Sequence, residues 1–206
     1  MATRTIHPDR TRQRELRREE LLDAADRIVR SRGRDTSMDE IAAEAGITKP
    51  ILYRHFGDKD GLYEALAERY VDELKEALLP AGKARGARER LAATIDAYLA
   101  YVEREPERYR FLLGAAERSR TAELMADFRR ERVERCADTA TANLRRVGIE
   151  GPLGELWAHA VSGLIREAGI WWLETRAMPR KRVVEHLTAV VWEGGGALPK
   201  AQQKTP

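Results

Sequence analysis

The residues from Thr48 to His55 bring hydroxyl, ammonium, guanidinium, phenol and imidazole groups together within about two helical turns. Such groups donate hydrogen bonds to phosphate oxygens, and side chains near the N-terminus of a helix in the major groove read base edges. Leu52 and Phe56 point to the inner side of the same expected helix. The outward residues are Thr48, Lys49, Ile51, Tyr53, Arg54 and His55. A plain helical corner in water is the alternative, but such a surface usually carries a mixture of glutamate and lysine, so the pattern favours a DNA-reading face.

Two short helices that meet at Gly46 must hold this face. Ser37 followed by Glu40 has the spacing of a capping box, which starts the first helix. Gly46 lies where that helix must end in a left-handed residue. Thr48 can cap the second helix, and Pro50 is tolerated in its first turn. The segment therefore predicts a helix-turn-helix.

A third helix is expected after the turn that Gly57 opens, with Asp58 as its cap. Lys59 in the first turn opposes the helix dipole. A DNA phosphate near the free N–H groups would remove this conflict. From position alone, an ordinary surface lysine explains Lys59 equally well.

This segment resembles the TetR family of bacterial transcriptional regulators over about residues 15–66. The resemblance is carried by Ile41-Ala42, Ala45-Gly46-Ile47, Leu52-Tyr53-Arg54-His55-Phe56, Lys59 and Leu62. In that family, the residues matching Thr48, Lys49 and Ile51 lie where bases are read. The residues that hold phosphates match Ser37, Tyr53, His55 and Lys59. The resemblance implies a homodimer that binds double-stranded operator DNA.

Composition and charge placement agree with an all-α chain of this kind. Alternating apolar stretches are rare. Residues 1–18 contain six arginines and two acidic residues, so they hold a net charge of +4 while the whole chain holds only +3. This basic segment could lie along phosphates or enter the minor groove, or it could be a solubilising tail.

We expect a three-helix DNA-binding domain joined to a helical domain for ligand binding and dimerisation. The expected parts are a basic flexible arm at 1–13, the helix-turn-helix domain at 14–60, the second domain at 61–200 and a disordered tail at 201–206. Helices in the second domain are expected at 87–104, 106–115, 121–147, 153–177 and 180–193.

Several classes of protein are disfavoured. No apolar run approaches the ~20 residues of a membrane span, and no signal-peptide core is present, so we expect a cytoplasmic protein without membrane contact. Cys136 is the single cysteine, which excludes an intrachain disulfide. The four histidines are scattered and no phosphate-binding glycine loop is present, so we predict no catalytic residues, no metal site and no cofactor.

The last two helices carry wide apolar faces, and the resemblance implies that such helices pair across a dimer. The predicted interface residues are Leu164, Trp172, Val183, Leu187, Val190 and Val191. The alternative is that both helices are core of a single protomer.

Aromatic and aliphatic residues of the second domain predict a ligand pocket, although the same spacing is typical of a filled core. The candidate lining is Tyr98, Tyr101, Phe111, Phe128, Arg132, Trp157, Val161 and Ile165. Arg132 lies on an otherwise apolar stripe, and a buried arginine must be paired. Its partner could be an internal carboxylate such as Glu117 or Glu167, or the acidic group of a fatty acid or acyl-thioester.

The sequence thus predicts a homodimeric repressor that a small hydrophobic ligand, with an acyl chain as one option, releases from its operator. The ligand would act by shifting the helix expected at 60–79. The alternative is a DNA-binding protein that a protein partner controls and that has no small-molecule pocket.

Overall fold

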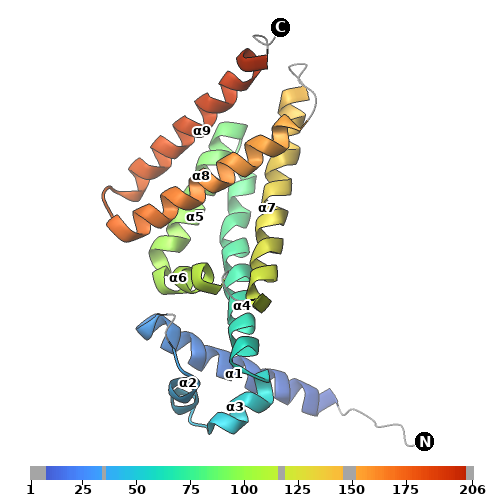
Figure 1. The fold of residues 1–206 in the computed structure, drawn as a ribbon, viewed down its shortest axis with the longest axis vertical. Helices are drawn as coiled ribbons and strands as arrows, with labels where there is room; N and C mark the ends of the chain where they lie inside the picture. Colours follow the sequence, from blue (N-terminus) through green and yellow to red (C-terminus); the bar gives the residue numbers. More distant parts are fainter. Residues whose placement is uncertain (1–7, 34–35, 116–118, 146–151, 203–206) are drawn as a thin grey trace, which may run out of the picture. The chain divides into compact units, whose positions relative to one another are not determined.

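The computed structural model describes residues 8–33, 36–115, 119–145 and 152–202 of the 206-residue chain. Regular structure in these ranges is entirely helical, so the prediction of an all-α fold is confirmed (Figure 1). The α-helices are α1 (Pro8–Arg32), α2 (Met38–Glu44), α3 (Lys49–Phe56), α4 (Lys59–Leu78), α5 (Ala87–Arg104), α6 (Pro106–Ala115), α7 (Ser119–Arg145), α8 (Leu153–Thr175) and α9 (Arg180–Gln202). A short 3₁₀ helix, η1 (Leu79–Lys83), follows α4. None of the helices in the described ranges is both long enough and apolar enough to cross a membrane.

The chain folds as two compact units, and each draws on two stretches of sequence. The first unit contains the described residues up to Val71 together with Glu107–Met125. The second contains the described residues from Asp72 to Pro106 and from Ala126 onward. The sequence placed a single boundary after residue 60, whereas the structure adds most of α6 to the first unit. Contacts between side chains of α1, α4 and α6 account for this difference and are described below.

The first unit has a core of aliphatic and small side chains on the facing sides of α1 to α4. The most deeply buried are Leu21, Ala25, Val29, Ile41, Leu52, Leu62, Leu66 and Ala67. Helix α1 begins at Pro8, so residues 8–13 are helical, although the sequence placed them in a flexible arm. This segment has no apolar stripe, and the length of α1 could not be seen in the hydrophobic pattern. Residues 1–7 lie outside the described ranges.

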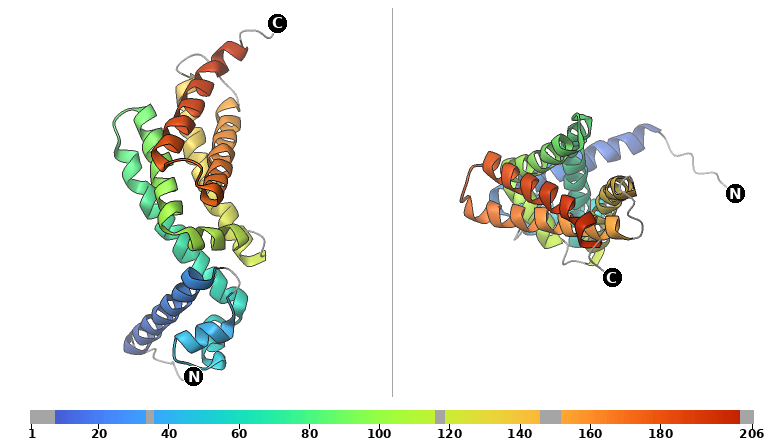
Figure 2. Two further views of the ribbon diagram at one scale, coloured as in Figure 1. Left: turned by 90° about the vertical axis from the view of Figure 1, so that its left-hand side faces the viewer. Right: turned by 90° about the horizontal axis from the view of Figure 1, so that it is seen from above.

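In the second unit, α9 packs mainly against α5, and α8 contacts both of these helices (Figure 2). The turn between α8 and α9 is closed by Trp172, whose indole Nε1–H donates to the carbonyl oxygen of Met178 at 2.8 Å. Arg176 ends α8 in the left-handed region, with φ of 47°. Its guanidinium carbon lies 4.3 Å from the centroid of the Trp172 ring.

Helix α9 runs on to Gln202, which is nine residues beyond the end expected at 193. The apolar periodicity stops near Val191 and a glycine run follows, so the pattern held no signal for the last two turns. This helix also enters the segment expected to be a disordered tail, of which residues 203–206 lie outside the described ranges.

Candidate nucleic-acid interface

The first helix of the reading head begins at the capping box that the sequence predicted. The Glu40 backbone N–H donates to Ser37 Oγ at 3.2 Å, and the Ser37 backbone N–H donates to Glu40 Oε2 at 2.9 Å. The Ser37 hydroxyl also donates to Glu40 Oε2, at 2.9 Å. The backbone hydrogen bond from Ser37 is the largest cause that lowers the pKa of Glu40. Because the Ser37 hydroxyl proton is engaged in the cap, it must leave Glu40 before it can bind a phosphate.

The turn between the two helices also follows the prediction. Gly46 has φ of 64°, and Ile47 N donates to the carbonyl of Ala42 at 2.9 Å. Thr48 occupies the N-cap position of α3 with an extended backbone, but its side chain forms no capping hydrogen bond. The Thr48 side chain is exposed, and it does not cap α3 as the sequence suggested. Asp58 caps α4, accepting from Gly61 N at 2.7 Å.

Helix α3 presents the expected polar set on one side. Leu52 and Phe56 are buried, while Thr48, Tyr53 and Arg54 are exposed. The other predicted contact residues are half-buried, namely Ser37, Lys49, Ile51, His55 and Lys59.

Two lysines on this surface already have partners within the chain. Lys49 Nζ lies 2.9 Å from Asp39 Oδ2, and this hydrogen bond is the main cause that raises the pKa of Lys49. Lys59 Nζ lies 5.1 Å from the centroid of the Tyr63 ring. The side chains of the Lys49–Asp39 pair are 40% and 72% exposed, and exposed ion pairs contribute little, typically ~0–1 kcal/mol. A phosphate or a base edge can therefore replace this pair at small cost, whereas Lys59 lies against the buried ring of Tyr63.

His55 lies in a strongly basic neighbourhood at the end of α3. Burial is the largest cause that lowers its pKa, and the positive charges of Arg54, Arg14, Arg17 and Arg18 lower it further. The imidazole is therefore mainly neutral at pH 7 and can donate or accept a hydrogen bond.

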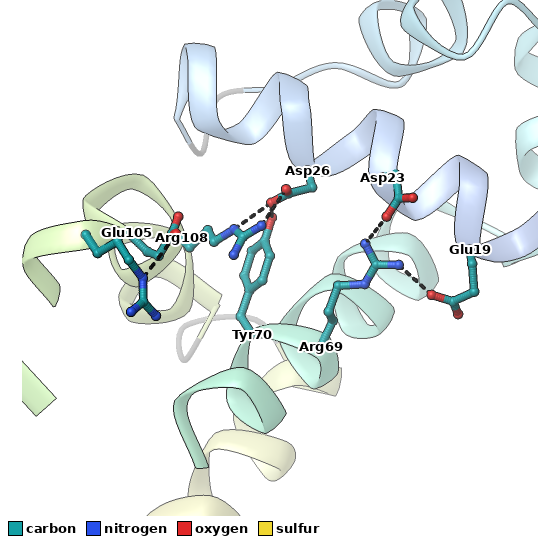
Figure 3. A network of polar contacts seen from close by, with 8 residues as sticks. Glu19, Asp23, Asp26, Arg69, Tyr70, Glu105 and Arg108 are labelled. Carbon is teal, nitrogen blue, oxygen red and sulfur yellow. Dashed lines mark hydrogen bonds and ion pairs between the residues drawn. The ribbon is translucent and has the colours of Figure 1, made fainter. Parts of the chain in front are cut away.

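A buried polar cluster joins α1, α4 and α6 within the first unit (Figure 3). Arg108 of α6 donates to both carboxylate oxygens of Asp26, at 2.7 and 2.6 Å. The hydroxyl of Tyr70 donates to Asp26 Oδ1 at 2.7 Å. Arg108 also lies over the Tyr70 ring, at 5.1 Å from its centroid. Burial alone would raise the pKa of Asp26, but the hydrogen bonds from Arg108 and Tyr70 outweigh it, and the pKa is lowered.

A second polar contact holds α4 on α1. Arg69 reaches Asp23 at 2.7 Å and Glu19 at 2.5 Å (Figure 3). Phe111 of α6 completes the arrangement, with ring centroids 5.1 Å from Tyr63 and 5.6 Å from Tyr70. Neither polar contact was predicted from the sequence. The cluster around Arg108 had one signal, Asp26, an acidic residue inside the apolar stripe of α1.

Comparison with known proteins agrees with this geometry. Residues 21–66 match the description "Bacterial regulatory proteins, tetR family", and residues 73–206 match "Tetracyclin repressor-like, C-terminal domain". The chain belongs to the TetR family. It is therefore a DNA-binding transcriptional regulator rather than an enzyme, as the sequence predicted.

Similar proteins include the HTH-type transcriptional activator FasR of Mycolicibacterium smegmatis, which is 30% identical over 193 residues, covering 90% of this chain and 86% of FasR. A TetR-like transcriptional regulator from Rhodococcus sp. RHA1 has a similar structure, with a TM-score of 0.69 at 27% identity over 86% of this chain and 94% of that one. AibR, solved in complex with isovaleryl coenzyme A and operator DNA, shares the fold at 20% identity, with a TM-score of 0.64 over 84% of this chain and 97% of AibR.

The pocket residues that the sequence proposed for this TetR-family regulator fall into both units. Phe111 lies in the first unit, where it packs on the tyrosines of α4. The other described members lie in the second unit: Tyr98, Tyr101, Phe128 and Val161 are buried, and Trp157 and Ile165 are half-buried. The side chain of Arg132 lies outside the described part of the structure. The ligand assignment of these residues stays a prediction.

The proposed interface residues also differ in exposure. Leu164 and Val190 are exposed, at 38% and 56%, and Leu187 is half-buried. Trp172, Val183 and Val191 are buried within the protomer, at 1%, 4% and 6% exposure. A partner subunit would therefore meet Leu164 and Val190 first.

Proposed function

We propose that this TetR-family regulator is a homodimeric, cytoplasmic repressor that a small hydrophobic ligand releases from its operator. The observation that supports dimerisation most directly is a group of large apolar side chains exposed on α8 and α9. The group, called here the α8–α9 surface, consists of Leu156, Leu164, Trp171 and Val190, with exposures from 38% to 66%.

Each chain has one reading head, so a dimer brings two reading heads to the same DNA. Two heads related by a twofold axis bind two half-sites about one helical turn apart, ~34–36 Å. Apolar side chains exposed together on one part of a protein favour association with another protein surface. Because a twofold dimer is self-complementary, the same α8–α9 surface serves both subunits.

Ligand control is supported by the apolar character of the second unit. Tyr98, Phe128 and Val161 contribute buried surface from three different helices. AibR, which shares this fold, binds isovaleryl coenzyme A, so an acyl chain is a reasonable first class of ligand to test. The name of FasR describes an activator, so the direction of regulation needs its own measurement. Control by a protein partner is the second candidate, and a filled second unit without bound ligand would favour it.

Native mass spectrometry of gently purified protein tests the dimer and the ligand together. A dimer with a discrete additional mass supports both parts of the proposal. An empty dimer supports dimerisation alone and leads to screening of acyl and drug-like libraries. A monomer contradicts the mechanism with two half-sites.

Charge placed on the α8–α9 surface gives a sharper test. Val190→Glu should shift the protein towards monomer, because a buried carboxylate at the interface would have no partner. Leu79→Glu is the matched control, since Leu79 is similarly exposed, at 64% against 56% for Val190, but lies on η1. Equal effects of the two substitutions would contradict the proposed interface.

The reading head is tested by fluorescence anisotropy at fixed salt. Lys49→Ala should weaken DNA binding and relax base preference, whereas Tyr53→Phe should weaken binding across all sequences. Unchanged affinity in both variants would show that the assigned face is wrong.

A further inference from the structure

The N-terminal half of α1 is a helix that carries arginines next to the end of α3. Arg14 and Arg17 are exposed, and Arg18 is half-buried. All three lie within α1, which begins at Pro8. Their spacing of three and four residues puts them on one side of the helix.

Direct packing places this side of α1 beside the reading helix. The guanidinium carbon of Arg18 lies 5.0 Å from the centroid of the Phe56 ring, and Phe56 is the last residue of α3. Arg54 lies two residues earlier and is exposed. The charges of Arg14 and Arg17 also act on the imidazole of His55, which shows that they are close to the same end of α3.

These arginines form few ion pairs within the protein that DNA would have to displace. Among the described residues, Arg14, Arg18 and Arg54 form no ion pair. Arg17 pairs with Glu20 at 2.6 Å, but both side chains are exposed, at 44% and 62%. An exposed pair of this kind stabilises little and can be exchanged for a phosphate.

This part of α1 contains three acidic residues, Glu15, Glu19 and Glu20. Glu19 binds Arg69 of α4 at 2.5 Å, which neutralises it within the protein. The four arginines outnumber the exposed Glu15 and Glu20, so this part of the surface keeps a net positive charge that the fold holds in place. A guanidinium group suits this role because its planar donors match the oxygens of a phosphate.

We propose that Arg14, Arg17, Arg18 and Arg54 form a basic ridge that binds backbone phosphates of duplex DNA next to the base pairs read by α3. The ridge extends the DNA-contact surface beyond α3 and the start of α4. This inference rests on the proposed function only in requiring that the reading head binds DNA. Its contribution is independent of sequence, since phosphates carry no base information. It therefore raises affinity and salt dependence without changing base preference.

The test compares salt dependence in two variants of the full-length protein that lose the same charge. Arg14→Gln/Arg17→Gln removes two exposed members of the ridge and leaves Arg18 in place on Phe56. The control is Arg129→Gln/Arg130→Gln, on exposed residues of α7 in the second unit. It is closely matched, because Arg130 pairs with Asp127 three residues away, just as Arg17 pairs with Glu20.

Binding to a fluorescein-labelled 30-base-pair duplex is measured between about 50 and 200 mM salt. Each lost phosphate contact lowers the slope of log K against log salt by ~0.9, so the ridge variant should lose up to ~1.8 per protomer. Over this fourfold range of salt, the wild type should lose about tenfold more affinity than the variant for each protomer that contacts the duplex. The α7 control should keep the slope of the wild type.

The outcomes separate this inference from the proposed function. If the wild type binds DNA in a salt-dependent way and the ridge variant has the same slope, the ridge does not bind phosphates. The DNA-binding function is then unaffected. Equal loss in both variants attributes the effect to net charge and also overturns the ridge. If the wild type does not bind any duplex, the reading head itself has failed. Circular dichroism of both variants confirms that they are folded.

Discussion

Replacing Asp26 by asparagine keeps the shape of the side chain and removes the charge at the centre of the polar cluster in the first unit. Arg108 now donates to both oxygens of the carboxylate, and Tyr70 donates to one of them. Asparagine offers one acceptor oxygen in place of two. At least one N–H group of Arg108 therefore loses its partner, and the guanidinium stays charged.

The magnitude follows from the burial of the pair. The side chains of Arg108 and Asp26 are only 12% and 11% exposed, so water cannot replace the lost contact easily. Removing one partner of a buried pair typically destabilises a protein by ~3–5 kcal/mol. The hydrogen bond from Tyr70 survives on the asparagine oxygen, so we expect a loss near the lower limit, about 3 kcal/mol. For a chain of this size, that corresponds to a fall in Tm of roughly 6–12 °C.

Urea denaturation followed by circular dichroism measures this loss, and the pH supplies a second check. The lowered pKa of Asp26 means that its contribution is complete above the pKa of an unfolded aspartate, about 4. It is then lost as the pH falls through the lower pKa of the folded state. The difference between wild type and Asp26→Asn should therefore be constant from pH 6 to 8 and shrink below pH ~4.

A second substitution separates a buried charge from a simple packing effect. Asp26→Asn/Arg108→Met also removes the guanidinium charge that loses the Asp26 carboxylate in the single variant, so it should be more stable than Asp26→Asn alone. A change in the free energy of unfolding of less than about 1 kcal/mol in Asp26→Asn, the range of exposed pairs, would show that the buried pair does not stabilise the first unit. A double variant no more stable than Asp26→Asn would show that the charge of Arg108 is not the cause of the loss.

Three further predictions concern single residues. Asp39→Asn frees Lys49 and removes a negative charge beside it. Binding to non-specific duplex should therefore rise by about 1.5- to 5-fold. Discrimination between operator and non-operator DNA should fall, and competition anisotropy measures both effects. A phosphate next to His55 raises the lowered pKa of its imidazole, so the wild type should bind DNA more tightly as the pH falls from 8 to 6. The gain in affinity is at most about tenfold per pH unit. His55→Gln should make the DNA affinity less dependent on pH. Gly169→Ala would put a Cβ 2.8 Å from the ring of Tyr98 on α5, so it should destabilise the protein by ~1–2 kcal/mol in urea denaturation. Gly163→Ala is the control: open space surrounds Gly163, so this substitution should be neutral or stabilising.

The reading head could be predicted from the sequence because its determinants are local. The capping box joins residues three apart, and the turn needs one left-handed glycine at position 46. Which residues of α3 are exposed follows from its helical period. Only the side-chain cap by Thr48 was absent, since its backbone alone completes the N-cap.

The assignment of α6 could not be predicted because it depends on contacts across a long stretch of chain. Asp26 and Arg108 are 82 residues apart. A charged residue at 26 signals that a partner is needed, but nothing local distinguishes Arg108 from the many other arginines. Phe111 illustrates the same difficulty, because an aromatic residue at helical spacing fits a ligand pocket and a tyrosine-lined core equally well. The structure places it in the core of the first unit.

Trp171 and Trp172 show why the sequence could not separate an interface from a core. Consecutive residues of a helix point about 100° apart, so a helix packed on one side buries one of the two and exposes the other. The apolar pattern of α8 is nearly continuous, and it does not indicate which side faces the protomer. The sequence assigned Trp172 to the interface, whereas the structure buries it at 1% exposure and leaves Trp171 exposed at 44%. The hydrogen bond from Trp172 to Met178 closes the turn before α9, so this residue helps to form the surface that a partner would meet. Trp171 is the member of the pair that such a partner could contact directly.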